Sequence, residues 1–372
     1  MRSNATLTVR FPTSLRISLL LCVALQLPAQ DAERRRRIEF VTKLPGFASL
    51  WDFVATNGVH FDAIQPPASK YDFHLEPLNP VREFWGEGRA ATMEDFPLLG
   101  RGPFGQAIRI RPESDPTLRP TLIVPRARLH DSPIDVKGPG KSVTLVAWII
   151  RESGNHAIAG IWHEGTDLKE RAGGAKRVEP GMRQYALFTG LAANNGASAA
   201  HVSENGGASF GDKYARNLSV TKQVITPRTE AVGDFDVIAM VFDNGKNTVT
   251  SYLNGVADEF WIDNPLDHPF FQWPAKAWPK DYNPPKNFVK AKDGKLLSLR
   301  VNPYYFPHDL YTPASQESGG PFTISRVIHS SRSVGSTGWI GGVAVFTQPL
   351  SASQIKRLTE QTKSPISASG VR

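Results

Sequence analysis

Seven polar and aromatic side chains lie close together in the middle of the chain, between positions 156 and 216. Imidazole and guanidinium groups bind hydroxyls and carboxylates, while aromatic rings stack on apolar surfaces such as the faces of sugars. The set therefore predicts a binding groove for a glycan. The alternative is that these residues lie at the rim and edge of the core, where they form hydrogen bonds with the backbone and bind nothing. The seven residues are His156, Trp162, Arg183, Tyr185, His201, Tyr214 and Arg216.

Strand periodicity decides which of these side chains can share a face. Successive side chains of a strand point to opposite sides, so residues 156, 158, 160 and 162 should line one face. By the same rule Arg183 and Tyr185 should share a face, and Gln184 should point away from both. If neighbouring strands align, the two faces would form one groove.

A polysaccharide lyase that uses some of the same residues is a more specific alternative. Elimination from a uronate needs a base, here Tyr185 or His201, to remove the C5 proton. It also needs a cation, here Arg183, to neutralise the sugar carboxylate so that this proton becomes removable. No catalytic residue is assigned if the protein only binds.

Other chemistries have little support. Glu113 and Asp115 resemble the start of a retaining-glycosidase strand, but no third carboxylate follows that could lie about 5 Å away across a sugar. Serine-hydrolase, phosphate-loop and HExxH motifs are absent. His156 and His163 have odd spacing, which disfavours a shared metal. Calcium stays open because scattered oxygens can bind it, and no other cofactor is predicted.

The N-terminus has the pattern of a secretory signal peptide. A basic segment is followed by an uncharged apolar run from Ile17 to Leu27, too short to span a membrane, and cleavage is expected near Gln30. Cys22 is the only cysteine, so the exported chain could form no disulfide. We predict a secreted, periplasmic or cell-surface protein with no transmembrane segment.

Charge gives a weak indication of partners. The first 30 residues contain three arginines and no acid, so 40 basic and 35 acidic residues remain, a net charge of +5. Mild basicity is compatible with an anionic polymer and is also ordinary for solubility. Residues 31–44 include four consecutive arginines without interleaved aromatics, which indicates a flexible basic leader and no nucleic-acid contact.

The rest of the chain has the rhythm of an all-β protein. Short β-rich runs alternate with Gly, Pro, Asn and Asp, and Asn-Gly pairs at 244–245 and 254–255 predict hairpins. Residues 141–152 are apolar on both faces, as in a covered central strand. Ser351 and Gln354 form a capping box that starts one short C-terminal helix.

Three of these runs carry a family resemblance. The stretches "VTLVAWIIRE", "FDVIAMVFDNGKNTVTSYLNG" and "IGGVAVFTQPLSASQIKRL" occur in the order found in the LamG-like concanavalin A lectin/glucanase superfamily. The resemblance covers about residues 45–360 and implies an antiparallel β-sandwich of concanavalin A-like jelly-roll type, similar to uncharacterised secreted bacterial LamG-domain proteins. The superfamily's glucanase strand, Glu-x-Asp-x-x-Glu, and the ordered strand motifs of its alginate lyases are missing.

These observations predict a secreted, non-catalytic carbohydrate-binding or adhesion module whose partner is a polysaccharide or glycan, neutral or anionic. A polysaccharide-degrading enzyme, lyase before hydrolase, and a protein-interaction module remain as alternatives. The predicted organisation is a signal peptide (1–30), the basic leader (31–44), one jelly-roll domain (45–360) with an aromatic and Pro-rich insertion (261–320), and a flexible tail (361–372).

Overall fold

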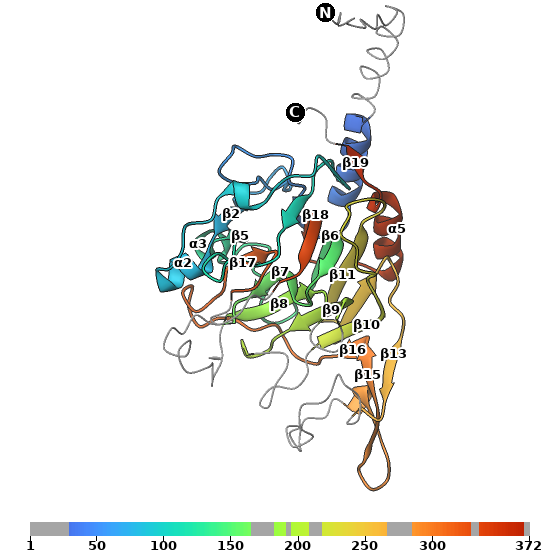
Figure 1. Cartoon of the computed structure of the whole chain (residues 1–372). Helices are drawn as coiled ribbons and strands as arrows, with labels where there is room; N and C mark the ends of the chain where they lie inside the picture. The colour runs from blue at the N-terminus through green and yellow to red at the C-terminus, as the bar shows by residue number, and fades with distance from the viewer. Residues whose placement is uncertain are drawn as a thin grey trace, which may run out of the picture.

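The computed structural model describes residues 30–164, 182–190, 195–207, 218–265, 285–328 and 335–367. Two seven-stranded antiparallel sheets form the body (Figure 1), so the predicted β-sandwich is confirmed. Sheet A has the order β1 (Phe47–Trp51), β18 (Thr337–Phe346), β6 (Val143–Ser153), β11 (Asp236–Asp243), β12 (Thr248–Leu253) and β16 (Tyr304–Tyr305), with β4 (Ile108–Ile110) also paired to β18. Sheet B has the order β10 (Leu218–Val224), β9 (Ala197–Val202), β8 (Arg183–Phe188), β7 (Ala157–Trp162), β17 (Phe322–Ile324), β5 (Thr121–Val124) and β2 (Glu76–Leu78).

Strand β6 lies in the middle of sheet A, between β18 and β11, and is buried on both sides. Leu145 and Ile149 belong to the core between the sheets, whereas Val146 and Trp148 belong to a second core on the outer face of sheet A. The prediction of a strand covered on both faces is therefore confirmed. The indole of Trp148 also donates to the Thr362 hydroxyl at 2.8 Å, which ties the C-terminal helix to the sheet.

The two Asn-Gly hairpins differ in their turns. At the end of β12, Asn254 and Gly255 both have positive φ, and the two residues flanking them exchange backbone hydrogen bonds. At the end of β11 the positive φ falls on Asn247 instead, with its backbone N–H bonded to the carbonyl of Asn244. That hairpin thus has a longer loop than the Asn-Gly pair predicted.

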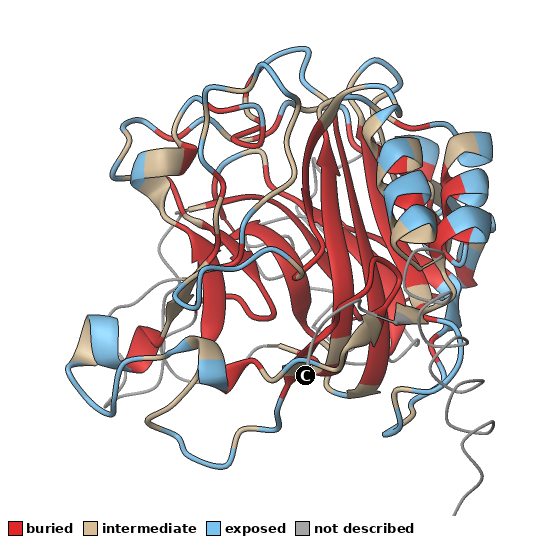
Figure 2. Cartoon of the chain, turned by 90° about the horizontal axis from the view of Figure 1, so that it is seen from above, coloured by how far each residue is buried: buried red, intermediate tan, exposed pale blue. Residues whose placement is uncertain are grey.

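Helices cover the outer face of sheet A. Helix α5 (Ala352–Thr362) begins with the predicted capping box and buries Ile355 and Leu358 in the outer core. A second helix, residues 30–42, buries Val41 in the same core, and Figure 2 shows the two helices side by side along the sheet. The remaining helical elements are α2 (Pro80–Trp85), α3 (Arg126–Leu129) and the 3₁₀ turns Met93–Asp95 and Pro285–Asn287.

The two ends of the described chain are more ordered than predicted. Residues 30–42 are not a flexible leader, because the Arg37 guanidinium donates to the Pro103 carbonyl at 3.0 Å and Arg34 pairs with the buried Asp52. The predicted flexible tail is also corrected, since β19 (Ile366–Ser367) pairs with β3 (Arg101–Gly102). Arginine side chains long enough to reach buried acceptors explain why a basic sequence folds back here.

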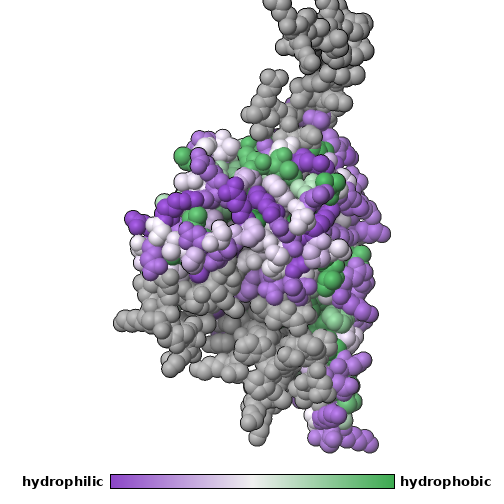
Figure 3. All heavy atoms as spheres, in the orientation of Figure 1, coloured by the Kyte–Doolittle hydropathy of each residue, from purple (hydrophilic) through white to green (hydrophobic). Residues whose placement is uncertain are grey.

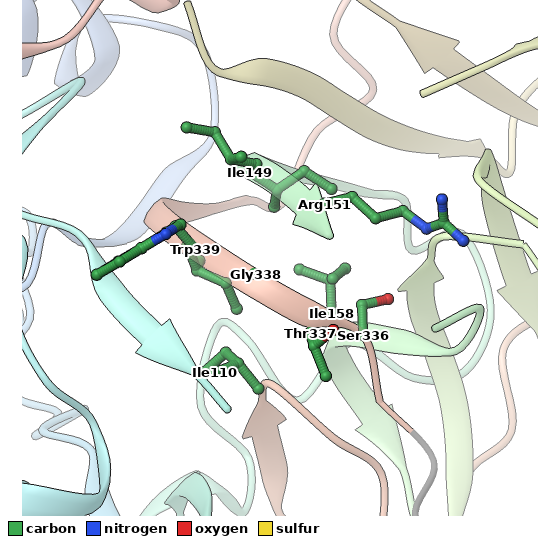
Figure 4. Close-up of a pocket in the computed structure, with 10 residues that line it drawn as sticks. Ile110, Ile149, Arg151, Ile158, Ser336, Thr337, Gly338 and Trp339 are labelled. Carbon is green, nitrogen blue, oxygen red and sulfur yellow. The ribbon is translucent and has the colours of Figure 1, made fainter. Parts of the chain in front are cut away.

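The interior between the sheets holds a cavity of about 10 Å³ at one end, which is room for one water molecule at most (Figure 4). Ile110, Ile149 and Ile158 are among the residues that line it. Arg151 extends away from these side chains in Figure 4 and donates to the Gly154 carbonyl at 2.8 Å. This cavity is too small for a sugar.

Part of the predicted insertion forms a third sheet, named the projecting sheet here, whereas β16 of the same insertion belongs to sheet A. The projecting sheet has the order β13 (Phe260–Asp263), β15 (Leu296–Asn302) and β14 (Phe288–Lys290). Ile262, Leu299 and Val301 pack in a third core against the outer face of sheet B. None of the described helices is long and apolar enough to cross a lipid bilayer.

Candidate functional site

Four of the seven predicted site residues meet on the outer face of sheet B. His156, Trp162, Arg183 and His201 come from β7, β8, β9 and the residue before β7, all neighbours in this sheet. Trp162 lies opposite Arg183 in the strand pairing, and His201 lies opposite Ala186. Antiparallel pairing of three consecutive strands therefore brings together residues that are 45 positions apart in the sequence.

Phe188 is the centre of this group, which we call the sheet B cluster. Its ring stacks on the His201 imidazole at a centroid distance of 4.1 Å and lies 4.7 Å from the His156 ring. The Trp162 ring meets Phe188 edge to face at 6.0 Å, and the Arg183 guanidinium lies 5.8 Å from the Trp162 ring centroid. The cluster thus combines two aromatic rings with two imidazoles and one guanidinium, groups that can contact both apolar and polar surfaces of a ligand.

Tyr185 is not part of the cluster. Its side chain belongs to the core between the two sheets, and its hydroxyl donates to the Ile134 carbonyl at 2.6 Å. Burial, with a smaller contribution from the negative charge of Asp135, raises the pKa of Tyr185 well above its usual value. A phenol held this way is a poor base, so the predicted groove position of Tyr185, and its role as a lyase base, are corrected.

Two β-bulges explain why strict alternation failed. In β8 the pairing with β7 shifts between Arg183 and Tyr185, so these two residues face opposite sides. In β7 a second shift places Ile158 in the inner core, on the opposite side from Trp162. A bulge inserts one unpaired residue and inverts the alternation beyond it, and a single sequence carries no clear signal for it.

Gln184, the extra residue of the β8 bulge, reaches the same loop as Tyr185 and does not point away from it. Its amide donates to Asp135 at 3.1 Å and to the Val136 carbonyl at 2.9 Å. The carboxylate of Asp135 also accepts from Arg126 at 2.7 Å and from Lys137 at 2.7 Å. This buried ion network therefore fixes the bulge that turns Arg183 toward Trp162.

The remaining two predicted residues, Tyr214 and Arg216, lie outside the described residues. Sequence reasoning missed Phe188 and Glu164. Phe188 is found only once the bulge is known, because strict alternation places it on the face opposite Arg183. Glu164 accepts from the Trp162 indole at 3.2 Å, and its spacing of two residues from Trp162 was an available signal.

The electrostatics of the cluster favour binding over proton transfer. Burial lowers the pKa of His201 to about 3, with a further lowering from His156 and a small opposing effect of Glu164. An imidazole with this pKa is neutral and only weakly basic near pH 7. Within the described ranges, no three His, Cys, Asp or Glu side chains gather closely enough to hold a metal ion.

Replacing Tyr185 by Phe tests the assignment of this residue to the core. The substitution removes one buried hydrogen bond and leaves the Ile134 carbonyl without its partner, so we expect the free energy of unfolding to fall by about 1–3 kcal/mol. Urea denaturation followed by tryptophan fluorescence measures this change. An unchanged midpoint would contradict the inner position of the hydroxyl.

Comparisons with known proteins give no family. No protein-family model matches the chain, and no curated protein matches it. Among solved structures, the chain is similar to the binding domain of botulinum neurotoxin DC in complex with SialylT, at 9% identity and a TM-score of 0.42, over 87% of this chain and 52% of that one. It is also similar to Trypanosoma rangeli sialidase in complex with sialic acid, at 10% identity and a TM-score of 0.40, over 92% of this chain and 38% of that one.

The chain is also similar to a solved structure of botulinum neurotoxin type C, a toxin whose entry into cells depends on interaction with two ganglioside molecules. The identity is 10% and the TM-score 0.39, over 88% of this chain and 53% of that one. The chain thus spans 38% to 53% of the length of these three solved chains. Because all three TM-scores are below 0.5, the fold assignment rests on the pairing of this chain's own strands.

Proposed function

We propose that this protein is a non-catalytic glycan-binding module of LamG-like type that acts outside the cytoplasm, and that the sheet B cluster is its sugar contact. The observation that carries the proposal is the convergence of Trp162, Phe188, Arg183 and two histidines on one sheet face. Rings stack on the apolar faces of a sugar, and neutral imidazoles and a guanidinium bind its hydroxyls or a carboxylate.

Two further features support binding rather than turnover. Tyr185 lies in the inner core and the pKa of His201 is about 3, so neither of the two residues predicted as a lyase base suits that role near pH 7. A strongly shifted pKa is also a mark of functional sites, because these sites often contain buried polar groups, which are rare on a sheet face that serves only for packing. His201 is such a group.

The burial of the cluster predicts how a sugar would bind. The four predicted residues and Phe188 are each at most 5% exposed, so little of their surface meets solvent in this structure. A ligand gains contact with the rings only if neighbouring groups rearrange, and such a requirement lowers association rates. We therefore expect slow association, measurable by biolayer interferometry.

The test is a glycan array probed with the purified protein and with a Trp162→Phe variant. Phenylalanine preserves an apolar ring but removes the indole that lies against Arg183 and Glu164, so we expect the affinity for any captured glycan to fall about tenfold or more. Tyr185→Phe is the matched control on the inner face of the same sheet. It should bind as tightly as the wild type.

Three outcomes would overturn the proposal. The first is a folded protein that binds no glycan of a broad array, and the second is a Trp162→Phe variant with full affinity. The third is an unsaturated product after incubation with uronate polymers, seen by its ultraviolet absorbance, which would show an enzyme instead. Secretion is tested separately, by N-terminal sequencing of the exported protein, with Asp31 expected as the first residue.

A further inference from the structure

The projecting sheet has one face that packs on the body and one that is open to solvent. Ile262 and Leu299 lie opposite each other in the strand pairing and are both buried in the third core. Their neighbours along the strands, Trp261 and Arg300, also form a cross-strand pair and point the other way by alternation. In Figure 1 the β14–β15 hairpin extends beyond the sandwich, and on the outward face Trp261 and Val289 are both exposed.

Trp261 forms a fixed aromatic platform on the outward face. It is 36% exposed, the most exposed of the large aromatic side chains in the described residues. Its indole N–H donates to the Glu259 carboxylate at 2.7 Å, and the Arg300 guanidinium lies 5.7 Å from its ring centroid. The ring is therefore held in one orientation while more than a third of its surface stays in water.

Positive charge is concentrated on the β14–β15 hairpin next to this platform. Residues 285–300 contain five cations and a single acid, Asp293, whereas the other acids of the sheet, including the Glu259 that bonds the indole, lie on and just before β13. The buried Nε of Arg300 has no hydrogen-bond partner among the described residues. In Figure 3 the extension at the lower right is mostly hydrophilic, with a few hydrophobic side chains among the polar ones. The five cations are Lys286, Lys290, Lys292, Lys295 and Arg300.

We propose that the outward face of the projecting sheet is a second binding surface, specific for acidic polysaccharides. Trp261 stacks on a sugar ring, Arg300 beside it binds a carboxylate or sulfate of that sugar, and the hairpin lysines hold the next acidic groups along the polymer. This inference goes beyond the proposed function, because it concerns a different surface and names the charge of the ligand.

An acidic polymer fits this surface better than a membrane. Only two apolar side chains, Val289 and Leu297, accompany Trp261 among the exposed large hydrophobic residues of this sheet. The exposed carboxylate of Glu259 holds the indole. Insertion of Trp261 into lipid would bury this charge, and burying a charged group is costly. A linear polyanion needs an extended strip with spaced cations, which a projecting hairpin provides.

The experiment measures binding to immobilised polygalacturonate and chondroitin sulfate by biolayer interferometry, with dextran as the neutral control. We expect both polyanions but not dextran to bind this surface, with affinity that falls as salt rises. Trp261→Ala should weaken binding about tenfold or more. The triple variant Lys290→Gln, Lys292→Gln, Lys295→Gln should weaken it similarly and reduce its salt dependence.

Matched controls separate this site from general basicity and from the sheet B cluster. Lys43→Gln and Lys356→Gln remove exposed lysines elsewhere and should leave binding unchanged. The effect of Trp162→Phe is measured separately, on the glycans that the array captures, so the two binding proposals can fail independently. The inference is overturned if neither polyanion binds, if Trp261→Ala binds with wild-type affinity, or if phosphatidylserine vesicles compete fully with polygalacturonate.

Discussion

Lowering the pH from 7 to 4 is expected to reduce the free energy of unfolding by about 3 kcal/mol through His201 alone. In the folded chain the buried imidazole stays neutral until the pH approaches its pKa of about 3. In the unfolded chain it takes up a proton near its usual pKa of about 6.5. The unfolded state thus binds more protons in this window, and the stabilisation, complete above pH 6.5, is lost as the pH falls toward 3.

Urea denaturation at a series of pH values measures this dependence. Glu33, whose pKa is lowered to about 2, and Asp135, whose pKa is also lowered, take up protons in the unfolded chain only near pH 4, so their part of the loss is confined to the acid end of the window. His201→Phe retains a ring that can stack on Phe188 and should flatten the dependence between pH 6.5 and 4. If the His201→Phe variant keeps the same pH dependence of the free energy of unfolding, His201 is not buried in its neutral form.

Asp135→Asn is expected to destabilise the protein by about 3–5 kcal/mol. The side chain of Asp135 is fully buried and bonds Arg126 and Lys137, both mostly buried. Burial raises the pKa of Asp135, but the hydrogen bonds from the two cations outweigh it, and the pKa lies below its usual value. An amide leaves two cations without their counter-charge, which is the costly way to break a buried ion pair.

The matched control is Asp131→Asn. Asp131 bonds the same lysine at 2.7 Å, but its side chain is 68% exposed, so its loss should shift the denaturation midpoint far less than the loss of Asp135 does. The denaturation midpoint of each variant decides between them. Equal effects would mean that the network around Asp135 does not stabilise the loop against β8.

Local sequence rules predicted the elements that have a regular pattern of apolar side chains, and the helix whose capping residues are close together in the sequence. Residues 143–150 of β6 are all buried and, apart from Thr144, apolar, because both faces of the strand are covered. Ser351 and Gln354 cap α5 because they are only three positions apart. The same rules misjudged residues 30–42. Four arginines suggested a flexible segment, but Arg37 reaches carbonyls at Pro103 and Ser364, and no sequence pattern indicates acceptors that distant.

The spacing of the β-rich runs, together with the resemblance that three of them carry, predicted the antiparallel sandwich, and four of the seven side chains chosen from the sequence meet on one sheet face. Which four was decided by the tertiary structure. The bulge at Gln184, held from outside the strand by Asp135, turns Arg183 toward Trp162 and Tyr185 toward the inner core. Alternation is a property of an ideal strand, whereas the position of a bulge depends on partners that only folding brings into contact.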